Sequence, residues 1–333
     1  MRFRAITLHV RSEEEYASYS DLLNKLYRRL NAFTKRVVMT EPMDVDVELK
    51  AVYSGFDMRG FDYAHDLLKE GYFTSISLGS EPYRANLLYA AEFLYRISEE
   101  LGPEANTMLA FTSGEPYETP YFPATRGGSF GISASLLYPS DLYGALYEAE
   151  EPEMTLRSVM KFLFTQAERE LLEELNEEAP FLGIDYSLSP WMEESSARVI
   201  SLLARTDFLE PGTPSAILEM NEIIREASEG LKSLGFNEVM LPMAEDNLLM
   251  EMVLEGRLKV RDLAYLSSYC VTGLDMVVIP FGDVTKLAKL IGDVLASGKV
   301  KGKVVGVRII PVDGKPGEEV ELGRFGRVPI MGL

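Results

Sequence analysis

Apolar and polar residues alternate along this chain with two periods, one typical of strands and one typical of helices. Period-two or continuous apolar runs predict strands at residues 2–10, 36–40, 47–54, 72–79, 107–114, 181–188, 237–243, 274–281 and 303–311. Helical spacing predicts one helix that Ser12 caps and others at residues 62–71, 83–100, 154–178, 192–205, 214–230, 246–255, 259–267 and 283–297.

The regular alternation of strands and helices predicts an α/β fold with a largely parallel sheet. An open doubly wound sheet and a closed α/β barrel both fit this order. The chain has no low-complexity linker and no clear internal repeat, so we interpret residues 1–333 as a single α/β domain.

The composition narrows the choice of partner and compartment. The 333 residues carry a net charge of −19, which repels phosphate backbones and anionic membrane surfaces, so we expect neither a nucleic-acid nor a membrane partner. No apolar run is long enough for a signal peptide or a membrane span. One cysteine and two histidines exclude a disulfide framework and a His-rich zinc site. We expect a cytoplasmic protein, and the scarcity of Gln and Cys beside many Glu suggests a thermophile.

Sites in parallel α/β folds gather where strands end, and polar residues follow several of the apolar runs here. In GIDYSLSP, Asp185 stands where an apolar residue is expected, and Ser187 and Ser189 follow at period two. A buried aspartate is costly unless it is paired or bound to a cation. Asp185 is therefore either a functional carboxylate or one that holds a turn.

Two further segments carry acidic residues at predicted strand ends. LPMAEDN contains Glu245 and Asp246, although Asp246 also fits an ordinary helix cap. SSYCVTGLDM contains Cys270, Thr272 and Asp275. A lone buried cysteine is more often a small apolar residue than a nucleophile, and no histidine is near Cys270 in sequence.

A long irregular segment at residues 115–130 is rich in Pro, Gly, Thr and Tyr, and such segments are often functional. It runs into Arg126, Gly127 and Gly128, where glycine backbone could approach an anion and Arg126 could bind it. A flexible glycine turn is the alternative. No phosphate-loop motif is present.

Several stretches resemble one known family. They are FRAITLHV, PATRGGSFGIS, GIDYSLSP, LPMAED, CVTGLDMVVIP, VVGVRIIPVDGKPGEEVELG and RVPIMGL. Together they are similar to the uncharacterised bacterial and archaeal family called domain of unknown function seven-eleven. That resemblance implies a ten-stranded α/β barrel like that of pyruvate formate-lyase. It does not bring glycyl-radical chemistry, because this chain lacks the neighbouring cysteine pair and the C-terminal glycyl motif.

We therefore expect a small-molecule enzyme acting on a small anionic metabolite, with carboxylates at one mouth of the barrel. The expected catalytic residues are Asp185, Glu245, Asp246, Asp275 and, through thiol chemistry, Cys270. Oxygen ligands from Asp185, Glu245 and Asp246 would suit Mg²⁺, Mn²⁺ or Ca²⁺. The expected substrate-binding residues are Arg126, Gly127, Gly128, Ser187, Ser189, Thr272 and Arg308.

A non-catalytic metabolite-binding or regulatory protein is the alternative function. In that case the acidic residues are structural, and Arg126 with its glycines binds the ligand. A homo-oligomer is expected for either function, because symmetric assemblies are common.

Overall fold

The computed structural model describes residues 1–56, 58–147 and 149–333. The contacts within the chain divide these residues into two compact units. Unit 1 comprises residues 1–53, 117–189 and 198–239, and unit 2 comprises residues 54–116, 190–197 and 240–333. The prediction of a single domain stays a prediction. Both units are mixed α/β with mostly parallel strands, as the alternating pattern predicted.

Unit 1 is built on one five-stranded sheet in the order β3-β2-β1-β7-β8. Its strands are β1 (Arg2–Val10), β2 (Thr34–Met39), β3 (Leu49–Val52), β7 (Gly131–Leu137) and β8 (Phe181–Asp185). Neighbouring strands are parallel except β1 and β7, which are antiparallel. Its helices are α1 (Glu13–Arg29), α5 (Pro139–Tyr147), α6 (Pro152–Leu175) and α8 (Thr213–Ala227), and α7 (Ser196–Ala204) spans its boundary.

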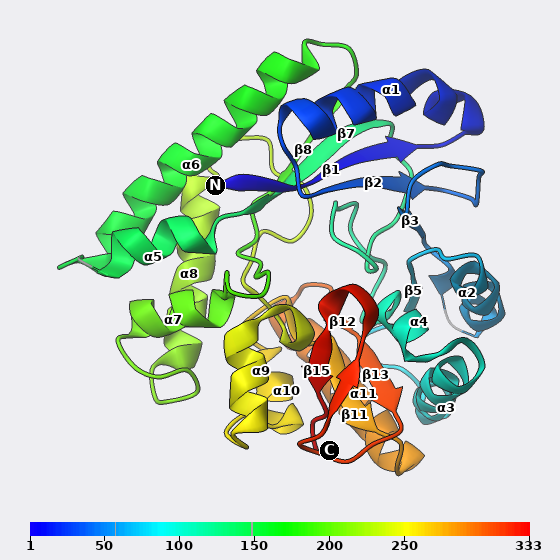
Figure 1. Ribbon diagram of the computed structural model, residues 1–333. Coiled ribbons are helices and arrows are strands. Elements are labelled where there is room, and N and C mark those ends of the chain that lie inside the picture. The colour runs from blue at the N-terminus through cyan, green and yellow to red at the C-terminus, as the bar shows by residue number, and fades with distance from the viewer. Residues whose placement is uncertain (57, 148) are drawn as a thin grey trace. The chain divides into compact units, whose positions relative to one another are not determined.

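The side chains of the β1–β7 strand pair give the unit 1 sheet one apolar and one polar face. Ile6, Leu8, Ile132 and Ala134 are fully buried on the apolar face. Figure 1 shows α1 lying along one side of this sheet, and α1 contacts β1. Ser12 caps the N-terminus of α1 as predicted, because its Oγ accepts the Glu15 backbone N–H at 3.3 Å.

Unit 2 contains a four-stranded sheet in the order β12-β6-β5-β4 and three strand pairs, β9 with β10, β11 with β13, and β14 with β15. The strands are β4 (Gly55–Phe56), β5 (Thr74–Ser77), β6 (Leu109–Thr112), β9 (Met240–Pro242), β10 (Thr272–Asp275), β11 (Val277–Pro280), β12 (Gly306–Val307), β13 (Ile309–Val312), β14 (Glu319–Glu321) and β15 (Arg327–Pro329).

The helices of unit 2 are α2 (Arg59–Lys69), α3 (Arg84–Leu101), α4 (Pro103–Thr107), α9 (Asn247–Leu254), α10 (Val260–Leu266) and α11 (Val284–Lys301), with 3₁₀ turns η1 (Met243–Glu245) and η2 (Gly323–Phe325). An aromatic cluster joins α2 and α3 to β6, since Phe61 contacts Phe93 and Phe111 at centroid distances of 5.0 and 5.9 Å.

Two predictions of single strands were wrong, because a break divides each apolar run into two strands that belong to different sheets. The apolar run at 274–281 is β10 and β11, separated at Met276, which has a φ of 54°. The run at 303–311 is β12 and β13, separated at Arg308. At these breaks, the Arg308 amide donates to Leu274 O and Val277 N donates to Arg308 O. The breaks turn each strand into a second sheet.

The sequence patterns also missed β7 and α5, which lie between the irregular segment and α6. The alternation in GISASLL is between small residues and apolar ones, which is a weak strand signal. The irregular segment itself is confirmed, since residues 115–130 form no helix or strand.

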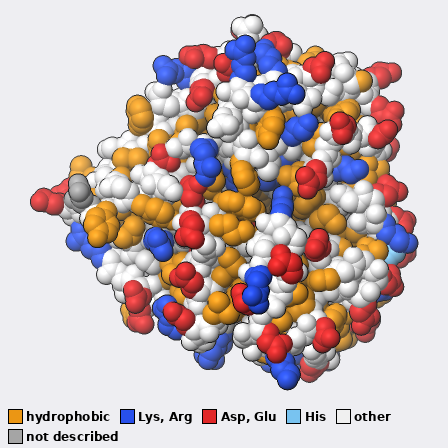
Figure 2. All heavy atoms as spheres, viewed as in Figure 1, with side chains coloured by type: hydrophobic (Ala, Val, Ile, Leu, Met, Phe, Trp, Pro, Cys, Tyr) orange, Lys and Arg blue, Asp and Glu red, His pale blue; other side chains and the backbone are white. Residues whose placement is uncertain are grey.

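Acidic and basic side chains are interspersed with apolar ones over the face of the molecule that Figure 2 shows. None of the helices in residues 1–56, 58–147 and 149–333 combines the length and apolarity that a bilayer span requires.

Candidate functional site

The second face of the unit 1 sheet is polar and buried. Thr7 and His9 on β1 and Ser133 and Ser135 on β7 are each 0% exposed. Thr7 and Ser133 are register partners across the antiparallel pair, so the four side chains form one patch. We call these four residues the polar face. A sheet face built this way is unusual, because a buried face normally carries apolar side chains.

His9 and Ser133 form a close pair within the polar face. His9 Nε2 lies 2.8 Å from Ser133 Oγ, a hydrogen-bond distance. Burial lowers the pKa of His9 to about 4, although the negative charge of Glu118 opposes that effect. The imidazole is therefore uncharged at neutral pH.

Three atoms of the polar face have no hydrogen-bond partner in the described part of the chain. They are Thr7 Oγ1, His9 Nδ1 and Ser135 Oγ. Leaving a buried polar group unpaired costs about 1–3 kcal/mol. Native proteins rarely retain such groups without a reason, and three of them on one patch indicate a surface made to meet polar atoms of a ligand or water.

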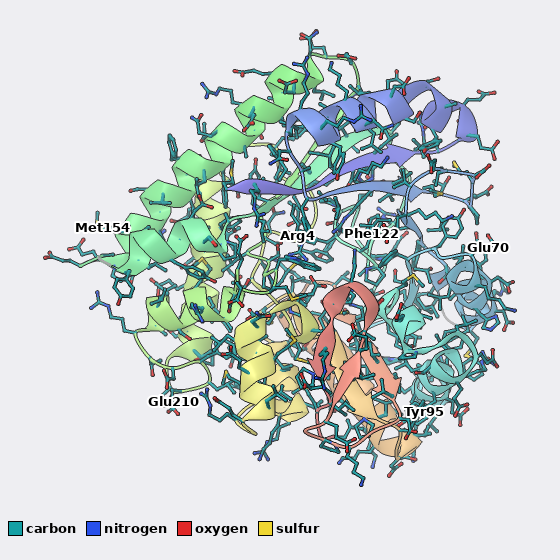
Figure 3. All side chains as sticks on the ribbon, in the orientation of Figure 1. Arg4, Glu70, Tyr95, Phe122, Met154 and Glu210 are labelled. Carbon is teal, nitrogen blue, oxygen red and sulfur yellow. The ribbon has the colours of Figure 1, made fainter. Side chains whose placement is uncertain are left out.

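Two buried arginines lie beside the polar face. Arg36 Nη1 donates to Pro120 O at 2.6 Å, and its guanidinium lies 5.2 Å from the Phe122 ring centroid. Arg4 Nη1 donates to Ser189 Oγ at 3.3 Å. The two arginines are 6% and 5% exposed, respectively. In Figure 3, Arg4 and Phe122 lie on the side of the sheet away from α1.

The irregular segment crosses this same side of the sheet. Besides Pro120 and Phe122, it supplies Tyr121, whose hydroxyl lies 2.8 Å from Ser189 Oγ. Burial raises the pKa of Tyr121 to about 12. The phenol is therefore neutral, and it forms part of the lining of the site.

Asp185 connects the irregular segment to the rest of unit 1 through hydrogen bonds to its carboxylate. Its Oδ1 accepts from Ser187 Oγ at 2.6 Å, Ser187 N at 3.1 Å and Asn237 N at 3.2 Å. Its Oδ2 accepts from Phe236 N at 2.8 Å and Thr119 Oγ1 at 2.9 Å. Five donors occupy the lone pairs of the carboxylate, so a cation could bind only by displacing them. Burial nevertheless raises the pKa of Asp185.

Gly235 shows how tightly this carboxylate is enclosed. A Cβ at Gly235 would lie 2.6 Å from Thr119 Oγ1, and closer still to Asp185 Oδ2. The residue also has a φ of +87°, which favours glycine. No larger residue fits at this position.

The predicted anion-binding glycines have a packing role. A Cβ at Gly127 would lie 2.7 Å from the Met39 carbonyl, so glycine is needed where this segment passes the end of β2. Gly128 has a φ of +149°, and the next residue, Ser129, donates from N and Oγ to Glu118 at 2.7 and 2.6 Å. The Arg126 amide donates to Tyr117 O at 3.2 Å.

In unit 2, three of the predicted residues meet in one buried ion cluster. Arg308 binds Asp275 bidentately, with Nε–Oδ1 at 2.7 Å and Nη2–Oδ2 at 2.9 Å. Arg308 Nη2 also reaches Glu245 Oε1 at 3.3 Å, and Nη1 donates to Thr107 O at 3.1 Å. Although burial works against the charge of Arg308, Asp275 and Glu245 raise its pKa. The Arg308 guanidinium is thus hydrogen-bonded to three groups of the protein itself, namely Asp275, Glu245 and the Thr107 carbonyl.

Asp246 has different partners from those of the ion cluster, although it follows Glu245 directly. Its Oδ1 caps α9 by accepting Leu248 N at 3.1 Å and Leu249 N at 3.4 Å, and Oδ2 accepts Ala197 N at 3.1 Å. The helix-cap interpretation of Asp246 therefore describes its contacts. Burial raises its pKa to about 6.

The remaining predicted residues are Cys270 and Thr272. Cys270 is buried in the turn after α10. Its thiol donates to the carbonyl oxygen of Leu266, the last residue of α10, at 3.2 Å. Thr272 lies on β10, and its Oγ1 has no partner among the described residues. Within those residues, no three His, Cys, Asp or Glu side chains are grouped as metal ligands.

A family model described as "Uncharacterised ACR (DUF711)" matches residues 86–323. The chain belongs to this family. It is 28% identical to a UPF0210 protein of Sulfurisphaera tokodaii over 70% of this chain and 56% of that protein. A UPF0210 protein of Methanopyrus kandleri is 35% identical over 49% of this chain and 37% of its own length. The chain thus spans about half or less of these curated relatives.

The sequence interpretation missed most of the polar face. It treated His9 only as one of two histidines, and it did not select Thr7, Ser133 or Ser135. A usable signal was present, because TLH in β1 and SAS in β7 each place polar residues at period two inside buried strands.

The pKa of His9 predicts acid sensitivity. In the unfolded chain His9 titrates near 6.5, but in the fold its pKa is about 4, so the unfolded state binds the extra proton between these values. His9 should therefore cost about 3 kcal/mol of unfolding free energy as pH falls from 6.5 to 4. Urea denaturation of wild type and His9→Gln across this range measures it. Equal pH slopes for both proteins would contradict the prediction.

Asp185→Asn should lower the unfolding free energy by about 2 kcal/mol or more. Phe236 N donates to one carboxylate oxygen of Asp185 and Asn237 N donates to the other. The amide NH₂ of an asparagine would therefore meet a backbone N–H in either orientation of the side chain. Urea denaturation measures the loss. The matched control is Asp21→Asn, an exposed aspartate on α1, which should change stability little.

Arg308→Lys should destabilise the fold by about 3 kcal/mol, because a lysine cannot serve Asp275 bidentately and also reach Glu245. The control is Arg261→Lys, since that side chain is 80% exposed. A midpoint of denaturation unchanged in both variants would show that the buried cluster contributes no net stability.

Proposed function

We propose that this protein binds a small anionic metabolite on the polar face of unit 1. The observation that carries the proposal is the set of three buried, unpartnered atoms, Thr7 Oγ1, His9 Nδ1 and Ser135 Oγ. Their hydrogen-bonding capacity is unused on a patch of rigid strands, which is a good scaffold for a binding site.

The arginines support an anionic ligand. Arg4 and Arg36 carry two permanent positive charges into a buried environment, where electrostatic interactions are stronger than in water. The hydroxyls of Thr7 and Ser135 add neutral donors. A carboxylate or a phosphate group matches such a donor set.

The metal-dependent version of the function has less support from the contacts. Asp185 and Asp246 both use their carboxylate oxygens for backbone and hydroxyl donors, and Glu245 contacts Arg308. A Mg²⁺, Mn²⁺ or Ca²⁺ ion stays a prediction of the sequence. Thermal shifts with each ion against a chelator test it, and a shift that Asp185→Asn abolishes would restore the metal site.

The remaining sequence-based expectations extend the same proposal. We expect a cytoplasmic homo-oligomer from a thermophile that binds neither nucleic acid nor membranes. We also expect the sheets to belong to a ten-stranded barrel, as the family resemblance implies. An experimental structure with an open doubly wound sheet would contradict the barrel.

Thr7→Val and Ser135→Ala should each weaken binding of a small anion about tenfold without lowering the unfolding free energy. Each substitution removes an unpartnered hydroxyl, so the fold loses no hydrogen bond while the ligand does. Calorimetric titration with inorganic phosphate, acetate and succinate measures affinity, and urea denaturation measures stability.

Thr74→Val is the matched control. Thr74 is also fully buried and its Oγ1 is also unpartnered in the described chain, but it lies on β5 in unit 2. It should leave the affinity unchanged. If none of the three anions binds wild type, or if all three variants bind alike, the proposed site is wrong.

A further inference from the structure

We propose that Ser133 and His9 are a nucleophile and its general base, and that the small anion is an acyl compound such as an ester or a thioester. This inference rests on the proposed function, because it uses the same polar face to hold the substrate. It turns the binding site into an acyl-transfer or hydrolytic site.

The geometry of the pair fits this role. The 2.8 Å distance from His9 Nε2 to Ser133 Oγ lies within the range that joins activated nucleophiles to their bases. Both residues stand on strands rather than loops, and the register of β1 with β7 fixes their separation. The pair is therefore preorganised before any ligand binds.

The protonation state of His9 is also suitable. An uncharged imidazole that carries its proton on Nδ1 has a lone pair on Nε2 facing Ser133 Oγ. Burial makes His9 a weak base on its own, with a pKa of about 4. A bound anion beside the ring would raise that pKa, which brings the base closer to working pH when substrate is present.

The unpartnered hydroxyls supply the second requirement of acyl transfer, which is stabilisation of the developing oxyanion. Thr7 is the cross-strand register partner of Ser133, and Ser135 lies two residues along the same strand face. Thr7 Oγ1 and Ser135 Oγ can therefore both donate close to a carbonyl that Ser133 attacks.

The reaction balances without any oxidant or reductant. Ser133 Oγ forms a bond to the acyl carbon and gives its proton to His9 Nε2. The bond from that carbon to the leaving oxygen or sulfur breaks, and the leaving group takes the proton from Nε2. Water then attacks the acyl-serine through the same base, releasing the acid and restoring Ser133.

Mono-p-nitrophenyl succinate, an anionic ester, is the probe for this chemistry. Stopped-flow absorbance should show a stoichiometric burst of p-nitrophenolate, and peptide mass spectrometry should place one succinyl group on Ser133. Ser133→Ala should abolish the burst, and His9→Asn should slow it about 100-fold or more. Neutral p-nitrophenyl acetate should react more slowly, because it lacks the charge that Arg4 and Arg36 attract.

Ser77→Ala is the matched control, because Ser77 is also a fully buried strand serine whose hydroxyl is unpartnered in the described residues, but it lies in unit 2. It should keep the full burst. Where Ser133→Ala does not fold, Ser133→Cys preserves the side-chain volume and should form a thioester of the same added acyl mass.

Phosphate titration of the same proteins separates the two proposals. If wild type binds phosphate and is acylated on Ser133, and the Ser133→Ala variant no longer reacts, the nucleophile assignment is supported. Wild type that binds phosphate but is acylated elsewhere, or not at all, overturns it and leaves a non-catalytic binding protein. Failure of both phosphate binding and acylation removes the proposed function as well.

Discussion

The Asp185 carboxylate accepts hydrogen bonds from three separate segments of unit 1, and the polar face depends on this arrangement. Thr119 belongs to the irregular segment, and Ser187 follows β8. Phe236 and Asn237 lie in the loop after α8. A single charged group thus holds in place a segment that forms no regular structure of its own. Because the carboxylate is fully buried, each of its five donors matters, since an unpaired charge at this depth would be very unfavourable.

In unit 2, a buried ion cluster of Arg308, Asp275 and Glu245 likewise connects separate segments of the chain. Arg308 interrupts one run of strand residues and Asp275 lies beside the interruption of another, and their bidentate contact stabilises the two breaks together. A buried ion pair adds little net stability over a well-packed apolar replacement, but removing one partner leaves an uncompensated buried charge. In this unit the cluster accompanies the change of sheet that the chain makes at Met276 and Arg308.

The two clusters and the polar face differ in how completely their polar groups are paired. Around Asp185 the acceptors are saturated, and around Arg308 the guanidinium has carboxylate and carbonyl partners. On the polar face, Thr7, His9 and Ser135 keep atoms unpaired within the described chain. Saturated groups stabilise a fold, whereas unsaturated buried groups destabilise it and are more readily explained by function. This contrast moves the candidate chemistry from the acidic residues to a histidine and its serine neighbours.

The sequence by itself determined the class of this protein and most of its elements. Apolar periodicity reports which side of a strand or helix is buried, so it identified strands such as β1 and helices such as α1 and α6. It also marked Asp185 as unusual, because a carboxylate inside an apolar run is rare, and it placed Glu245 at the end of a predicted strand. Only the tertiary structure decided what these residues contact. Asp185 meets backbone amides far along the chain, Glu245 meets Arg308, and His9 meets Ser133 across an antiparallel strand pair. Such pairings depend on strand order and register, which local periodicity does not encode.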